Sequence, residues 1–180
     1  MKKIVIVSAV LASVLVAQNY NQDANKIAKE LIKNLGGNLK KELKANGAVS
    51  AMKYCHAHAY ELSKKVSDSY ENVEVKRVSL KPRNPANEPN AKEKAVLKSM
   101  HKSINSGVKP HNFKVEDEKK VVVYKPLVIK KKACLICHGD VAKNRPKLAK
   151  KIAQLYPTDK ATGYKMNDMR GAIVVTFTKK

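Results

Sequence analysis

The sequence has no tryptophan, only two phenylalanines, and only four arginines among its 37 basic residues. Stacked aromatic rings hold single-stranded nucleic acids, and arginine forks make most specific contacts with bases and phosphates. The chain has little of either, so its formal net charge of +22 does not indicate a nucleic-acid partner. A lysine-rich surface suits solubility or the attraction of an acidic protein partner equally well.

Long apolar runs are also scarce, because only residues 4–17 form an uncharged apolar stretch. Lys2 and Lys3 precede it, and it ends in the small residue Ala17. This pattern is typical of a signal peptide, and the stretch is short for a membrane span. We therefore predict a signal peptide at residues 1–17, export to the periplasm, and one mature domain at residues 18–180 with no membrane span. An uncleaved N-terminal anchor is the alternative.

Cysteines number only three, and two of them lie in a C-x-x-C-H motif made by Cys134, Cys137 and His138. Two thiols at this spacing can form thioether bonds to one haem, and the following histidine lies under the iron as its ligand. We therefore predict one covalent haem c. A zinc site would need further Cys or His at a second short spacing, and a thioredoxin-like redox pair would sit in a β-α-β pattern; the sequence shows neither.

The remaining cysteine, Cys55, is a candidate for the second iron ligand. It shares one face of a predicted helix at residues 48–66 with small and apolar side chains, whereas His58 is displaced from that face by about 60°. Cys55 is therefore preferred and His58 is second, although a free cysteine can equally be a small buried apolar residue. The other candidates, ranked lower, are His56, His101, His111, Met100, Met166 and Met169.

The remaining pattern predicts a mixture of helices and strands. An amphipathic helix is expected at residues 22–45, with Gly36-Gly37 as a candidate break, followed by a turn at Asn46-Gly47. Pro126 should place its strand at an edge or a bulge. The other expected elements are strands at 73–80, 120–130 and 172–178, an ordered loop at 81–90, and helices at 91–104 and from Pro146 to about Tyr156.

Three segments together carry a family resemblance: the helix around Cys55, the run Arg-Asn-Pro-Ala-Asn-Glu-Pro at residues 83–89, and the stretch from the C-x-x-C-H motif to residue 172. They resemble a family of bacterial c-type haem domains with a PAS-like fold, which often form the sensor part of signalling proteins. The resemblance implies an α+β fold in which long N-terminal helices pack on a small antiparallel sheet that cradles the haem. It also implies that His138 and Cys55 are the axial ligands.

The matched loops contain Arg77, Arg83 and Arg170, whose guanidinium groups suit the carboxylates of haem propionates. The alternative is that these arginines brace the loops through backbone carbonyls. The sequence departs from the family pattern at Asn167, where a glycine is usual, so we expect a tight or strained turn there.

Two functions are compatible with these residues. A thiolate opposite histidine favours ferric iron, and a bond that weakens on reduction would free a position for a small gas, so redox or gas sensing with a separate acidic partner is our prediction. A periplasmic electron-transfer cytochrome is the alternative, because a lysine-rich surface steers acidic partners. We expect no enzymatic activity, since only His56 and His58 could form a distal acid–base set.

Overall fold

The N-terminal part of the chain folds as a helical hairpin. The computed structural model describes residues 19–180, so the predicted signal peptide lies outside the described residues. Helix α1 spans Tyr20–Asp68 and reverses direction at Gly47, whose φ of 79° and ψ of −178° are not helical. The predicted turn at Asn46-Gly47 is confirmed. The break at Gly36-Gly37 is wrong, because the helix continues through both glycines.

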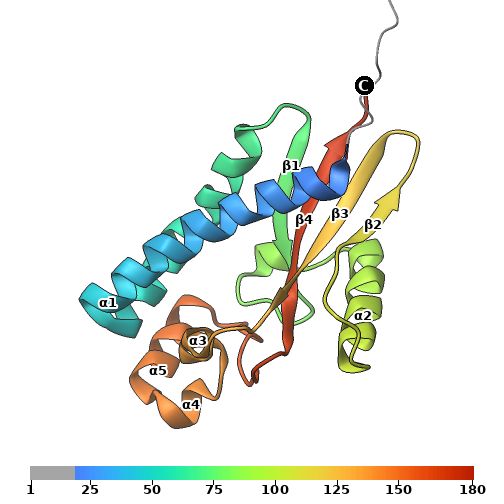
Figure 1. Ribbon diagram of the computed structural model, residues 1–180. Coiled ribbons are helices and arrows are strands. Elements are labelled where there is room, and N and C mark those ends of the chain that lie inside the picture. The colour runs from blue at the N-terminus through green and yellow to red at the C-terminus, as the bar shows by residue number, and fades with distance from the viewer. Residues whose placement is uncertain (1–18) are drawn as a thin grey trace, which may run out of the picture.

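A four-stranded antiparallel sheet follows, in the order β1-β4-β3-β2 (Figure 1). Its strands are β1 (Val73–Val78), β2 (Phe113–Glu116), β3 (Lys120–Val128) and β4 (Met169–Thr178). The α+β class is therefore confirmed, and this sheet contains no parallel β-α-β unit of the kind that a thioredoxin-like motif requires.

Pro126 lies in an inner strand, and the sheet accommodates it by leaving one side of β3 open there. Strand β2 pairs with β3 only from Val121 to Tyr124, so Pro126 has a single neighbouring strand, β4. The register also shifts between Leu127 and Val128. The proline thus occupies a local edge followed by a bulge, as its missing N–H demands.

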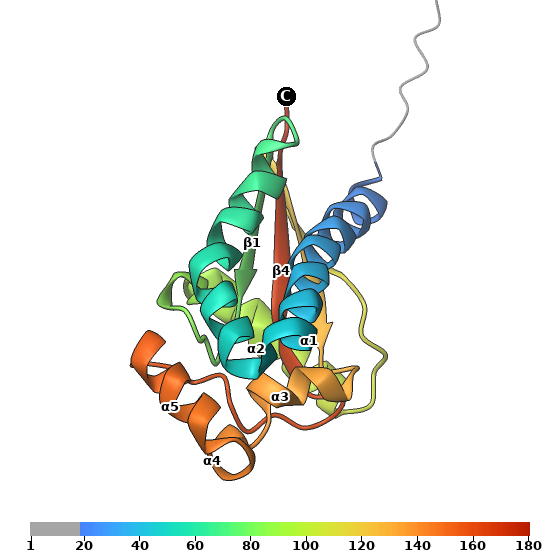
Figure 2. The ribbon, with the colours of Figure 1, turned by 90° about the vertical axis from the view of Figure 1, so that its left-hand side faces the viewer.

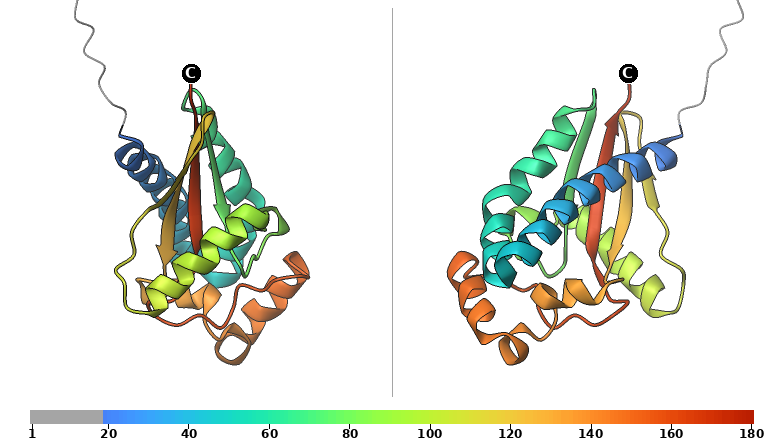
Figure 3. Two further views of the ribbon diagram at one scale, coloured as in Figure 1. Left: turned by 90° about the vertical axis from the view of Figure 1, so that its right-hand side faces the viewer. Right: turned by 60° about the vertical axis from the view of Figure 1, so that its left-hand side comes forward.

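Helices cover both faces of the sheet (Figure 3). Helix α2 (Ala91–Asn105) lies on one face and begins with a capping box between Asn90 and Glu93. The hairpin α1 covers the other face. Alternate residues of β4 serve the two sides: Ile173 and Val175 pack in the cluster with α1, whereas Val174 packs in the cluster with α2. This is the period of two that a doubly covered strand shows.

The C-x-x-C-H motif belongs to a separate group of short helices, which we call the motif lobe (residues 129–168). It contains η2 (Lys132–Cys134), α3 (Leu135–His138), α4 (Val141–Asn144) and α5 (Pro146–Leu155). Figures 1 and 2 show α3, α4 and α5 at the end of the sheet opposite the C-terminus, beneath the turn of the α1 hairpin.

Apolar packing fixes the lobe against α1, because Met52 of that helix is buried against Leu148, Ile152 and Tyr156. The two ends of the lobe are held together by hydrogen bonds that pair Ile129 with residues 167 and 168. Asn167 has a φ of 72° there, so the strained turn expected at this position is present. Within residues 19–180, no helix has the length and apolar character that crossing a bilayer requires.

A close approach of strands β1 and β4 makes Gly171 a sensitive position. A Cβ atom at this residue would overlap the carbonyl oxygen of Val78, whereas one at Gly37 of helix α1 would meet no atom within 4 Å. We expect Gly171→Ala to lower the free energy of unfolding by about 1–3 kcal/mol. The matched control Gly37→Ala should raise it by up to about 1 kcal/mol. Urea unfolding monitored by circular dichroism measures both, and equal effects would contradict this interpretation.

Candidate haem site

The motif residues lie on one short helical turn. Cys134 ends η2, and Cys137 and His138 end α3, which is only four residues long. The segment that follows α5 returns along this turn: the amide of Tyr164 donates to the carbonyl of His138 at 2.9 Å, and the amide of Gly163 donates to that of Gly139 at 2.9 Å. These bonds fix the backbone of the motif independently of its side chains.

The imidazole of His138 is oriented by the same returning segment. Its Nδ1 lies 2.8 Å from the carbonyl oxygen of Ala161. A carbonyl can only accept, so Nδ1 carries the proton and Nε2 keeps its lone pair for a metal. Burial, with help from the nearby charge of Arg170, lowers the pKa of His138 to about 3. The ring is therefore neutral at physiological pH, as an iron ligand must be.

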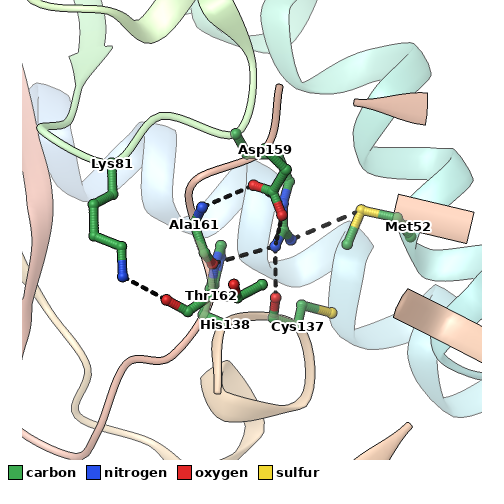
Figure 4. A network of polar contacts seen from close by, with 8 residues as sticks. Met52, Lys81, Cys137, His138, Asp159, Ala161 and Thr162 are labelled. Atoms are coloured by element: carbon green, nitrogen blue, oxygen red, sulfur yellow. Dashed lines mark hydrogen bonds and ion pairs between the residues drawn. The ribbon is translucent and has the colours of Figure 1, made fainter. Parts of the chain in front are cut away.

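Arg83 connects all three segments that carry the family resemblance. Its Nε and Nη2 donate to the two carboxylate oxygens of Asp159, each at 3.1 Å, and Nη2 also donates to the carbonyl oxygens of Cys137 at 2.8 Å and Ala161 at 3.2 Å. Its Nη1 lies 3.9 Å from the sulfur of Met52 on helix α1. Figure 4 shows this network, in which Asp159, Cys137 and Met52 surround one guanidinium group.

The Arg83–Asp159 ion pair is deeply buried, with about 9% of each side chain exposed. The carboxylate also accepts from the amide of Ala161 at 2.8 Å. Arg83 therefore braces the loop that orients His138, which is the alternative role considered for it above.

Cys55 lies on the face of α1 that the sequence predicted. Three of its neighbours on that face, Ala51, Met52 and Val66, are buried, and the cysteine itself is half-buried. Burial raises the pKa of the Cys55 thiol to about 11, and the nearby Cys137 thiol adds to this effect. The charges of Arg77 and Arg83 act in the opposite direction. The structure thus brings Cys55, the motif and two of the predicted arginines into one electrostatic neighbourhood.

A cavity of about 150 Å³ lies beside His138, and two arginines line it. Its lining residues are Arg77, Val78, Ser79, Asn87, Leu127, His138, Arg170 and Gly171. The Nε atoms of Arg77 and Arg170 are buried and have no hydrogen-bond partner. A buried guanidinium N–H without an acceptor is costly, so this space suits an anionic group.

These residues fit a haem in their chemistry: a neutral imidazole, a nearby sulfur, and arginine N–H groups that lack acceptors, as two propionates would require. The cavity is below the range of about 300–1,000 Å³ typical of ligand pockets. The cavity is therefore too small to enclose a whole macrocycle.

The other predicted ligands lie elsewhere. His56 and His58 are exposed and contact the rings of Tyr156 and Tyr54, respectively. His111 is exposed too. His101 is half-buried on α2, and its Nε2 has no hydrogen-bond partner among the described residues.

The predicted methionine ligands also lie away from His138, either in the core or at the surface. Met100 and Met169 pack in the core between α2 and the sheet, and Met166 is largely exposed. None of the three belongs to the group around His138.

Sequence reasoning did not identify Asp159, Ala161 or Met52 as parts of the site. Asp159 was inside a segment that carried the family resemblance, but a loop aspartate gives no sign that its partner is an arginine 76 positions earlier. Ala161 acts through its backbone, which no side-chain pattern reveals.

Comparison with known proteins gives one family and one fold. The sequence profile of the Tll0287-like family matches residues 4–178. The crystal structure of a cyanobacterial haem protein, Tll0287, superposes with a TM-score of 0.67 at 22% sequence identity, covering 88% of this chain and 94% of that one. At that identity the likeness establishes the fold. A search of curated proteins found no match.

The buried ion pair yields a stability prediction. Arg83→Met should lower the free energy of unfolding by about 3–5 kcal/mol, because Asp159 is left charged and without its partner. The control Lys64→Met removes an ion pair whose side chains are about 60% exposed, and should cost no more than about 0.5 kcal/mol. Urea titration of the purified protein provides both values. A loss for Arg83→Met as small as that of the control would show that the pair does not hold the loop.

Proposed function

The chain belongs to the Tll0287-like family, and from this premise we propose that it is an exported protein that carries one covalent haem c and acts in redox or gas sensing. The observation that carries the proposal is the state of His138. It directly follows the two motif cysteines, and its Nδ1 is occupied by the Ala161 carbonyl at 2.8 Å. This arrangement leaves Nε2 as the ligand atom. The export step rests on the N-terminal sequence, and a PAS-like fold remains our interpretation of the sheet and its helices.

Cys134 and Cys137 would hold the haem through thioether bonds. Both are free thiols in the structure and are half-buried. Residues 134–138 form one turn, so the two sulfurs and the imidazole come from the same rigid unit. Arg77 and Arg170 would bind the propionates, because both residues line the cavity beside His138 and their buried Nε atoms have no hydrogen-bond partner. Arg83 would hold the loop in place, since Asp159 and two carbonyls already take its N–H groups.

We assign Cys55 as the second axial ligand. Its helical face points toward the motif lobe, as the burial of Met52 against α5 indicates. Cys137 contributes to the raised pKa of the Cys55 thiol, so the two cysteines are neighbours. His58, our second candidate, lies on the exposed side of the same helix.

The two ligands differ in how firmly the protein holds them, which supports sensing. His138 is fixed by hydrogen bonds at its ring and its backbone. The sulfur of Cys55 forms no hydrogen bond among residues 19–180. Bound haem supplies one-electron redox chemistry and a position for a diatomic gas. Cys55 would be the ligand that yields that position, because only packing retains it.

Electron transfer is the second candidate, and the lysine-rich surface of the motif lobe favours it. We propose no catalytic activity. His56 and His58, the residues that could act as acid and base, are exposed and contact the rings of Tyr156 and Tyr54, respectively.

Covalent attachment is tested by expressing the full chain in the periplasm of a bacterium with c-type haem assembly. We expect a pyridine haemochrome spectrum of haem c and a mass increase of one haem in the denatured protein. Replacing both Cys134 and Cys137 by Ala should abolish both signals. A colourless protein of unmodified mass would contradict the proposal.

The matched control is Cys55→Ala, which should keep the covalent haem because it leaves the motif intact. Its ferric absorption spectrum should change, since a thiolate ligand is lost. An unaltered spectrum would exclude Cys55 as a ligand while leaving haem attachment standing.

Sensing and electron transfer are separated by the reduction potential and by gas binding. We expect a low potential, because a thiolate ligand favours ferric iron, and we expect the ferrous protein to bind carbon monoxide. Redox titration and difference spectra under carbon monoxide measure these properties. A high potential with no gas binding would instead support an electron carrier.

A further inference from the structure

We propose that the motif lobe is the docking surface for an acidic redox protein, which exchanges one electron with the haem that the lobe carries. The partner loses or gains one electron and the haem iron gains or loses it, with no bond made or broken. The proposal rests on the proposed haem and adds a surface and a partner class to it.

The lobe has a higher density of positive charge than the rest of the predicted mature chain, with a formal net charge of +7 on 40 residues. Residues 129–168 contain ten basic and three acidic side chains. The basic residues include the run Lys130, Lys131 and Lys132 directly before the motif, all exposed. Lys143, Lys147 and Lys150 on α4 and α5 are exposed as well.

The lobe's positive charges all lack ion-pair partners, whereas six basic residues elsewhere among residues 19–180 have one. Within residues 19–180, none of the ten basic residues of the lobe forms an ion pair. Lysines outside the lobe do, for example Lys76 with Glu93 at 2.7 Å and Lys179 with Glu116 at 2.8 Å. With ten basic and three acidic side chains, the lobe keeps a net charge of +7. Its field therefore extends into solvent and attracts an anionic surface.

The three acidic residues of the lobe are all engaged within the fold. Asp159 pairs with Arg83, Asp140 accepts from the amide of Lys143 at 3.2 Å, and Asp168 accepts from that of Lys165 at 2.7 Å. Their carboxylates support loops and helix ends, which leaves the lysines to dominate the exterior.

An acidic protein suits this surface better than a lipid bilayer. Proteins that lie on membranes usually combine basic residues with an inserted apolar face. The exposed large apolar side chains among residues 19–180 are Ile32, Tyr60, Val108, Val115 and Met166. Only Met166 belongs to the lobe, so electrostatic attraction acts there with almost no apolar anchor.

The location also suits electron exchange. The lysine run ends two residues before Cys134, and the lobe projects from the sheet at the end opposite the C-terminus (Figure 1). A partner held by these lysines would lie close to the motif.

The test compares two triple charge reversals in the haem-loaded protein. The lobe variant is Lys143→Glu/Lys147→Glu/Lys150→Glu. The control is Lys65→Glu/Lys119→Glu/Lys120→Glu, which changes three exposed lysines without ion pairs in the described structure. These lie near the end of α1 and in the β2–β3 connection, at the other end of the molecule. Both variants change the net charge equally.

Two measurements follow on each variant. One is the rate of oxidation of the ferrous protein at low ionic strength by hexacyanoferrate(III), an anion, and by tris(phenanthroline)cobalt(III), a cation. The other is carbodiimide cross-linking to flavodoxin, an acidic redox protein. We expect the lobe variant to react about tenfold more slowly with the anion and faster with the cation, and to lose the cross-link. The control should change by less than about twofold.

Equal rate losses in the two variants would overturn the proposal, because the whole surface would then steer the probe. Lobe-dependent sedimentation with phosphatidylglycerol vesicles, without a flavodoxin cross-link, would overturn it in favour of a membrane surface. The pyridine haemochrome of each variant reports separately on the haem. The cross-link needs no haem, so a failure of the proposed function and a failure of the docking surface are distinguishable.

Discussion

The buried pair of Arg83 and Asp159 is the interaction on which the site depends. One guanidinium joins the loop after β1, the end of α3 and the segment after α5, and it lies against Met52 of α1. Taking two charges out of water is costly, and the cost is offset here because nearly every N–H of the arginine has an acceptor. The pair holds a loop that has no regular structure of its own, and that loop in turn orients the imidazole of His138.

The same region contains more positive charge than the protein itself compensates. Arg77, Arg83 and Arg170 all influence His138, and only Asp159 lies opposite them as a fixed negative charge. Burial lowers the pKa of Arg77 and that of Arg170, which shows how unfavourable their position is in the absence of an anion. A fold that gathers such charges is suited to an acidic cofactor, and binding of that cofactor should contribute to folding. The positive field of the motif lobe extends the same imbalance to the outer surface.

Much of this arrangement could be predicted from local sequence rules. The start of α2 follows from the capping box at Asn90 and Glu93, and the start of α5 follows from Pro146. The inward face around Cys55 follows from helical periodicity. In each of these places a short stretch of chain determines its own conformation.

Other features depend on distant partners and could not be read from the sequence. Strand β2 is four residues long and largely exposed, and its alternation Phe-Lys-Val-Glu is too short to predict a strand by itself. Helix α1 continues through Gly36 and Gly37 despite the low helix propensity of glycine, and the turn of helix before them packs on the sheet through Leu31 and Leu35. The link from Arg83 to Asp159 spans 76 positions and uses two polar loop residues, a pattern that most exposed loops share.

The acceptor for His138 is the main-chain oxygen of residue 161, so almost any side chain at that position could preserve the bond. What has to be conserved is instead the length and path of the segment between the motif and this oxygen. An inserted or deleted residue in the loop at 157–160 would displace the acceptor and turn the imidazole away from its axis. In this family the spacing of the chain should therefore be under stricter selection than the identity of the residue that makes the contact.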